Sequence, residues 1–196
     1  MTTFYILQKT IEANKGGVNA ASFAHANELQ QLHLGMVHLV HTQPTDMSQQ
    51  TLMTYLHEQK GLREEVDVVQ PSRDLSDGEQ INWLREILAN SLLQDDVVLI
   101  NEDKSLFAAV AMYKHAMPML SVIQVLHNSH VDCSGNVKKS YQNMFVRQDD
   151  IDRFIVLTKQ QQFDLASEGW LRPEKLVYLP NVACALPVKS QKSDPQ

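Results

Sequence analysis

The sequence predicts an α/β fold in which a parallel sheet of about seven strands is covered by helices on both faces. Two observations lead to this prediction. Short apolar runs alternate along the chain with longer segments of helical period, and several runs are continuous stretches of Val, Ile and Leu. Strands buried on both faces have this composition, because helices cover each side of a parallel sheet.

The expected strands and helices follow one another in a regular β-α repeat. Ser76 with Glu79 three residues later is typical of a helix start, and Thr158 stands at an N-cap position directly after an expected strand. The expected strands cover residues 4–7, 36–40, 66–69, 97–100, 120–126, 154–157 and 176–179. The expected helices cover residues 20–32, 47–59, 79–92, 106–115, 139–145 and 159–167.

Composition limits the function classes. The chain has 196 residues, 43% of them hydrophobic, which is enough for one large domain with its own core. Its 17 Lys and Arg against 23 Asp and Glu give a formal net charge of -6, so no general field attracts nucleic acid. Nucleic acid is therefore not expected as a partner, and any anion must bind at a local site.

The cysteines and the apolar runs favour a cytoplasmic protein. Cys133 and Cys184 are too few for a disulfide framework, which favours a reducing compartment. The N-terminus has no signal-peptide pattern, and the apolar stretch 106–112 is shorter than the roughly 20 residues that cross a bilayer. Residues 185–196 are polar and contain proline, so we expect a domain over 1–184 followed by a linker or disordered tail.

The segment after the first expected strand ends in Gly16 and Gly17, where a helix is expected to begin. Adjacent glycines let backbone N–H groups approach an anion closely, and the helix N-terminus adds partial positive charge. Two glycines before a helix are also an ordinary turn device. The dinucleotide pattern Gly-x-Gly-x-x-Gly is absent, and no Gly-Lys-Ser/Thr follows, so neither a Rossmann fingerprint nor a P-loop is indicated.

The fifth expected strand leads directly into a polar segment from His127 to Cys133 that also contains His130. A histidine at a strand end can hydrogen-bond a sugar hydroxyl or hold a reacting group near neutral pH. The alternative is a loop whose polar side chains only satisfy backbone groups. These three residues recur at a spacing of three, but no second ligand cluster is evident, so no metal site is expected.

Other polar residues allow a functional and a structural interpretation. Glu102 can cap the helix that follows it or bind acceptor hydroxyls. Lys138, Lys139 and Arg147 form either a solvated helix face or an anion-binding rim. The remaining candidates are predicted to be structural: His38 and His41 as partly exposed strand-end histidines, and Trp83 and Trp170 as packing anchors.

Taken together, four segments resemble the N-terminal, Rossmann-like half of a GT-B glycosyltransferase. They are Gly16-Gly17, the Val-Leu-His127-Asn-Ser-His130 segment, the stretch from Asp152 to Leu165 and the stretch from Lys175 to Asn181. Within that class the chain is most similar to retaining glycosyltransferase family 4, especially enzymes that glucosylate poly(glycerol phosphate) wall teichoic acid.

The resemblance implies specific roles. Gly16 and Gly17 would lie at the donor diphosphate and sugar, His127 would contact the transferred sugar as the catalytic residue, and His130 would lie toward the acceptor. Partners would be a nucleotide sugar and a glycan or polyol-phosphate acceptor, with peripheral membrane contact left open. No cofactor and no metal is expected. The chain would be one half of an enzyme whose C-terminal donor domain carries a Glu-x7-Glu pattern, and would be inactive alone.

Two other functions stay open. One is a non-catalytic GT-B-like partner subunit that recognises an acceptor, because the same fold can persist without catalysis. The other is a flavodoxin-like signalling or cofactor domain, which usually needs about five strands, fewer than the seven expected here.

Overall fold

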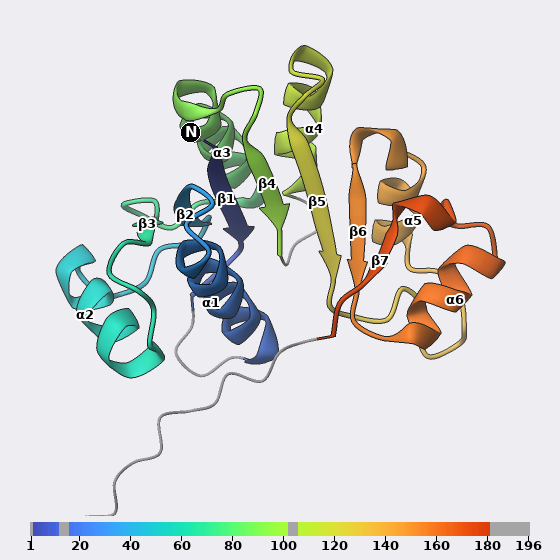
Figure 1. Ribbon diagram of the computed structural model, residues 1–196, viewed down its shortest axis with the longest axis horizontal. Helices are drawn as coiled ribbons and strands as arrows, with labels where there is room; N and C mark the ends of the chain where they lie inside the picture. Colours follow the sequence, from blue (N-terminus) through green and yellow to red (C-terminus); the bar gives the residue numbers. More distant parts are fainter. Residues whose placement is uncertain (1, 12–15, 102–105, 181–196) are drawn as a thin grey trace, which may run out of the picture.

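The computed structural model describes residues 2–11, 16–101 and 106–180. In these ranges the chain forms one parallel sheet of seven strands in the order β3-β2-β1-β4-β5-β6-β7 (Figure 1). The strands are β1 (Thr3–Gln8), β2 (Met36–His41), β3 (Asp67–Val69), β4 (Val97–Ile100), β5 (Ser121–Leu126), β6 (Arg153–Val156) and β7 (Leu176–Tyr178).

Helices connect successive strands, so each connection crosses from the carboxyl edge of the sheet back to the amino edge. The α-helices are α1 (Gly16–Gln31), α2 (Gln49–Lys60), α3 (Asp77–Ser91), α4 (Phe107–Ala116), α5 (Lys139–Phe145) and α6 (Lys159–Ser167). Two 3-10 helices, η1 (Gln148–Asp150) and η2 (Pro173–Lys175), precede β6 and β7. Among the described residues, no helix is both long and apolar enough to span a membrane.

Each face of the sheet has its own core (Figure 1). On one face, Phe23 of α1 and Leu52 of α2 pack against Ile6, Leu39 and Leu99. On the opposite face, α3 to α6 pack against strand residues that alternate with these; the buried members include Leu84, Val110, Phe145, Leu165, Leu7 and Ile100. The alternation follows from the period of two along each strand.

The predicted fold class and the seven predicted strands are confirmed. Both predicted helix starts are also confirmed. The Glu79 carboxylate accepts hydrogen bonds from the backbone N–H and the hydroxyl of Ser76, and the Thr158 hydroxyl accepts one from the Gln161 N–H. Helix α1 begins at Gly16, four residues before the predicted start at 20, because Gly16 and Gly17 carry no side chain that could mark a helical period.

The strand order reverses between β1 and β4. The chain runs outward from β1 through β2 to β3, and then returns to the other side of β1 to form β4. Ligands in open α/β sheets bind beyond the carboxyl ends of the strands at such a switch point. The predicted boundary between a domain over 1–184 and a tail over 185–196 lies outside the described residues.

Candidate functional site at the strand-order switch point

Helix α1 places its N-terminus at the carboxyl edge of β1. Gly16 and Gly17 form its start, and no acidic side chain stands in its first turn. The first N–H groups of a helix have no partner within the helix, and its dipole favours negative charge there. A Cβ added to Gly17 would meet no other atom within 4 Å, so open space adjoins this backbone.

Asn101, the first residue after β4, joins α1 to the end of β5. Its backbone N–H donates to the Leu7 carbonyl at 2.8 Å, which continues the ladder between β4 and β1. Its side-chain amide donates to the Ser22 hydroxyl in the second turn of α1, and its Oδ1 lies 3.0 Å from Nε2 of His127. The two glycines and His127 therefore lie at the same edge of the sheet.

This network fixes the chemical form of His127. Because the Asn101 amide nitrogen donates to Ser22, its Oδ1 accepts, and the proton of His127 lies on Nε2. Burial, reinforced by the nearby His25, lowers the pKa of His127 to about 4, against a smaller opposing effect of Asn101. At neutral pH the ring is uncharged, and Nδ1 is its remaining hydrogen-bond acceptor.

Four neighbouring strands contribute polar side chains to a row beneath α1. Gln8, His41, Asn101 and His127 each stand two residues after a member of the α1-side core, which places them on the same face of the sheet. We call these four residues the polar row. Gln8 and His41 face each other in register, and neither has any exposed surface.

Several buried polar atoms at and near the polar row have no hydrogen-bond partner within the described ranges. Both side-chain atoms of Gln8, Nε2 of His41 and Nδ1 of His25 are buried there without a hydrogen bond. Leaving such a group unpaired costs about 1–3 kcal/mol, so each one requires an explanation. Their concentration at the switch point is the pattern expected of groups that bind a ligand or ordered water.

The prediction for His41 is wrong. It was expected to be a partly exposed strand-end histidine, but it is fully buried, and its Nδ1 donates to the Gln43 carbonyl at 2.8 Å. Burial, only partly offset by that hydrogen bond, lowers its pKa to about 4. His38 is half-buried as predicted and lies 2.9 Å from Asp67. The two histidines lie on opposite faces of the sheet: His41 follows Leu39 on the α1 side, whereas His38 lies on the other face, where it stacks on Tyr5.

The segment after His127 folds into a compact loop. Asp132 accepts hydrogen bonds from the N–H groups of Ser134 and Asn136, and Lys138 donates through Nζ to the Ser129 carbonyl at 2.8 Å. His130 is 4% exposed, and neither of its ring nitrogens has a partner among the described residues. The loop thus holds a buried imidazole three residues after the partly buried His127, and the Lys138 side chain closes the loop.

The other predicted acceptor residues are not gathered in this loop. Lys139 is the exposed first residue of α5. Arg147 follows α5 and pairs with Asp150 at 2.8 Å, in the 3-10 helix that leads into the amino end of β6. Glu102 lies outside the described residues, as does Cys184, whereas Cys133 is a free, exposed thiol. Within the described ranges, no three His, Cys, Asp or Glu side chains form a metal-binding group.

The sequence reasoning missed several members of this site, namely Gln8, Ser22, His25 and Asn101. A signal for the strand residues was present: a polar residue two positions after an inward apolar one, at the end of adjacent strands. For Ser22 and His25 no such signal exists, because only the packing of α1 over the sheet brings them to the polar row.

Comparison with known proteins supports the fold assignment. No family model matches the chain, and no curated protein matches it in sequence. Among solved structures, S. aureus TarM matches with a TM-score of 0.72 and 10% identity over 94% of this chain. The pneumococcal O-GlcNAc transferase GtfA matches with a TM-score of 0.67 and 12% identity over 91%. The fold is that of GT-B glycosyltransferases.

The matched structures are longer than this chain, which spans 62% of the TarM chain and 60% of the GtfA chain. A UDP-N-acetylglucosamine 2-epimerase from Rickettsia bellii also matches, with a TM-score of 0.58 and 14% identity over 92% of this chain and 45% of that chain. The names of the matched proteins include both sugar transfer and sugar epimerisation, so the reaction of this chain has to be argued from its own site.

Proposed function

We propose that the chain is the acceptor-side half of a glycosyltransferase that moves a hexose from a nucleotide diphosphate sugar to a glycan or polyol-phosphate acceptor. The observation that supports it is the meeting of an open helix N-terminus at Gly16-Gly17 with a neutral, partly buried His127 at the strand-order switch point. Several matched structures are of proteins crystallised with UDP and a sugar.

Each part of the site would meet one demand of the reaction. In transfer, the bond between the sugar C1 and the diphosphate oxygen breaks, an acceptor hydroxyl oxygen bonds to C1, and the hydroxyl proton leaves with the diphosphate. The N–H groups at Gly16 and Gly17 would stabilise the negative charge on the departing diphosphate. His127 Nδ1 would accept a hydrogen bond from a sugar hydroxyl and so orient the ring.

The low pKa of His127 decides between a role as general acid and a role in contacting the sugar. A general acid must carry a proton near the working pH, and a ring with a pKa of about 4 does not. We therefore assign His127 to sugar contact and orientation. Glucose as the transferred hexose and retention at C1 belong to the same proposal, and they rest on the family resemblance. A second, donor-binding half and the absence of a metal or cofactor requirement rest on the same resemblance. A cytoplasmic location is also part of the proposal, and it rests on the two cysteines and the short apolar runs.

The proposal is tested by transfer from UDP-glucose in the full-length protein. The His127→Ala variant is expected to lose about 10²-fold in kcat/KM, the usual cost of removing one preorganised polar contact. The matched control is His115→Ala, because His115 is an exposed histidine of α4 whose side chain pairs with Asp150 at the amino edge, at 3.2 Å. Normal turnover in His127→Ala, or an equal loss in the control, would contradict the assignment.

A second candidate function is a non-catalytic subunit that binds an acceptor for an active partner. One matched structure is the GtfA/B complex, with a TM-score of 0.68 and 13% identity over 91% of this chain. A Glu-x7-Glu pattern further along the gene, together with release of UDP by the full-length protein, would favour the enzyme. Acceptor binding without UDP release would favour the subunit.

A further inference from the structure

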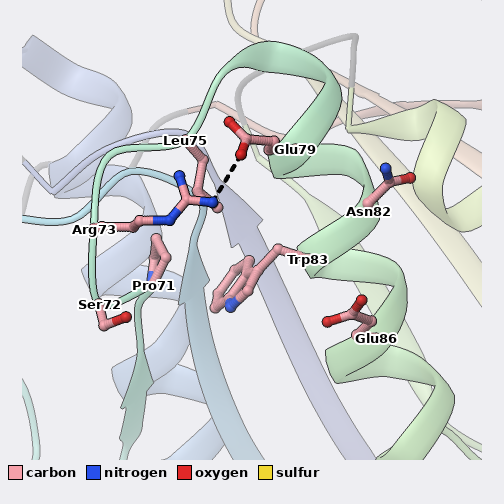
Figure 2. A pocket seen from close by; sticks show the side chains of 8 residues that line it. All are labelled: Pro71, Ser72, Arg73, Leu75, Glu79, Asn82, Trp83 and Glu86. Atoms are coloured by element: carbon pink, nitrogen blue, oxygen red, sulfur yellow. Dashed lines mark hydrogen bonds and ion pairs between the residues drawn. The ribbon is translucent and has the colours of Figure 1, made fainter.

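A pocket away from the polar row lies between the β3–α3 loop and the first three turns of α3 (Figure 2). Its volume is about 290 Å³, at the lower end of the range of about 300–1,000 Å³ typical of small-ligand pockets. Figure 2 shows Trp83 projecting from α3 toward the loop that carries Pro71 and Arg73. The size suits a single ring rather than a nucleotide.

The pocket is attached to the carboxyl edge of the sheet. Thr42, which follows β2, donates through its hydroxyl to Gln80 of α3 at 3.0 Å, and Lys9, which follows β1, lies 3.4 Å from Asp77. The first turn of α3 is thereby held at the same edge as Gly17 and His127. A ligand in the pocket would occupy the side of this edge formed by β2 and β3.

The charged residues that line the pocket are Arg73, Glu79 and Glu86, and the first two form an ion pair. Arg73 contacts Glu79 at 2.7 Å, and Ser76 donates to the same carboxylate. Arg73, followed by Ser76, lowers the pKa of Glu79 to about 2, so this pair is ionised and mutually neutralised. Glu86 has no side-chain partner among the described residues, which leaves the pocket with a net negative charge and disfavours phosphate.

The remaining polar groups are those that bind hydroxyls. Asn82 and Ser72 have no side-chain hydrogen bonds within the described ranges, and the same holds for the indole N–H of Trp83. An amide, a hydroxyl, a carboxylate and an indole N–H supply both donors and acceptors around one aromatic face. A sugar ring has a matching surface, since its hydroxyl groups alternate as donors and acceptors and its C–H face is apolar.

We propose that this pocket binds one neutral sugar ring, with its C–H face on Trp83 and its hydroxyls hydrogen-bonded to Asn82 and Glu86. Sugar binding in this pocket does not depend on whether the protein is a transferase. The further statement that the bound sugar belongs to the acceptor rests on the proposed function. If the pocket is an acceptor subsite, the part of the acceptor bound there is a neutral glycan and not a polyol phosphate.

The experiment titrates neutral oligosaccharides (maltotriose, cellotriose and chitotriose) and glycerol 3-phosphate into the protein. The titration uses the 196-residue chain, whose sequence has 2 tryptophans, so the Trp170→Phe background leaves Trp83 as its only tryptophan and its emission reports on the pocket. At least one neutral saccharide is expected to change that emission saturably, whereas glycerol 3-phosphate is not. No response to any of the three, or tighter binding of glycerol 3-phosphate, would overturn the proposal.

Three variants separate contact from folding. Asn82→Ala and Glu86→Ala remove exposed side chains without structural partners, and each is expected to weaken saccharide binding about 10-fold. Glu58→Ala is the matched control, because Glu58 is an exposed glutamate on α2, against the opposite face of the sheet. Equal affinity in Glu86→Ala and Glu58→Ala would overturn the assignment of Glu86.

A UDP titration of the full-length protein, followed by NMR at His127, keeps the two proposals apart. Saccharide binding at Trp83 without UDP-dependent shifts at His127 would retain the sugar site and contradict the donor site. UDP-dependent shifts at His127 without saccharide binding at Trp83 would retain the donor site and contradict the sugar site.

Discussion

The amino edge and the carboxyl edge of the sheet both bury polar side chains, but they pair them differently. At the amino edge, Asp96 accepts hydrogen bonds from the N–H groups of Thr3 and Leu93, both at 2.8 Å. Asp152 accepts from the Val122 N–H and from the Lys114 ammonium, also at 2.8 Å. These interactions tie β1, β5 and α4 to the segments that precede β4 and β6.

At the carboxyl edge, the polar row has the opposite character. Gln8 and His41 are fully buried without full pairing among the described residues, and the pKa values of His41 and His127 are both about 4. Polar groups at the amino edge therefore complete the fold, whereas those at the carboxyl edge remain available for a ligand. The predictions below test this difference between the two edges.

The largest effect on stability is expected from Asp152→Ala at the amino edge. The change leaves Lys114, whose side chain is 15% exposed, without its carboxylate, and it removes the acceptor of the Val122 N–H. Breaking such a partly buried pair is expected to lower the free energy of unfolding by about 3 kcal/mol, measured by urea denaturation. The control Asp149→Ala removes an 84% exposed carboxylate and should cost less than about 1 kcal/mol.

The next effect compares two glycines. A Cβ at Gly35 would lie 1.9 Å from the Thr2 carbonyl oxygen, so Gly35→Ala is expected to cost about 2 kcal/mol in unfolding free energy. Gly17→Ala meets no neighbouring atom and should leave stability within about 0.5 kcal/mol. If ligand uses the open space at Gly17, the same change should weaken UDP binding about 10-fold, measured by NMR titration. Unchanged UDP affinity would contradict a donor role for Gly17.

A smaller effect is expected from acidification. The pKa of buried His41 is about 4 in the folded chain against 6.5 when unfolded, so below pH 6.5 the unfolded state binds a proton that the folded state does not. The stabilisation is present above pH 6.5 and is lost as the pH falls toward 4. Between pH 7 and pH 5 the loss attributable to His41 should be about 1–2 kcal/mol.

The check on this prediction is a pair of urea denaturation curves at pH 7 and pH 5 for the wild type and for His41→Gln. The wild type should lose more stability than the variant over this interval, because Gln does not titrate. Equal losses would show that His41 takes up its proton equally well in both states.

Sequence reasoning reached the secondary structure because each element has its own local signal. Continuous runs such as 97–100 mark strands covered on both faces, and the pair Ser76 and Glu79 marks a helix start. It also selected Gly16, Gly17 and His127, since each stands at the carboxyl end of a strand where such folds bind ligands. Their roles toward a donor sugar stay predictions.

The sequence by itself determined the order of strands and helices along the chain and the polar composition of the segments after β1 and β5. Only the tertiary structure decided which of those polar groups meet. Asn101 joins Ser22 to His127 across 79 and 26 residues of sequence, and Trp83 faces the β3–α3 loop. The physical reason is the separation along the sequence over which each property is set. Helix and strand signals depend on residues a few positions apart, whereas burial, hydrogen-bond partners and pKa values depend on packing between distant segments.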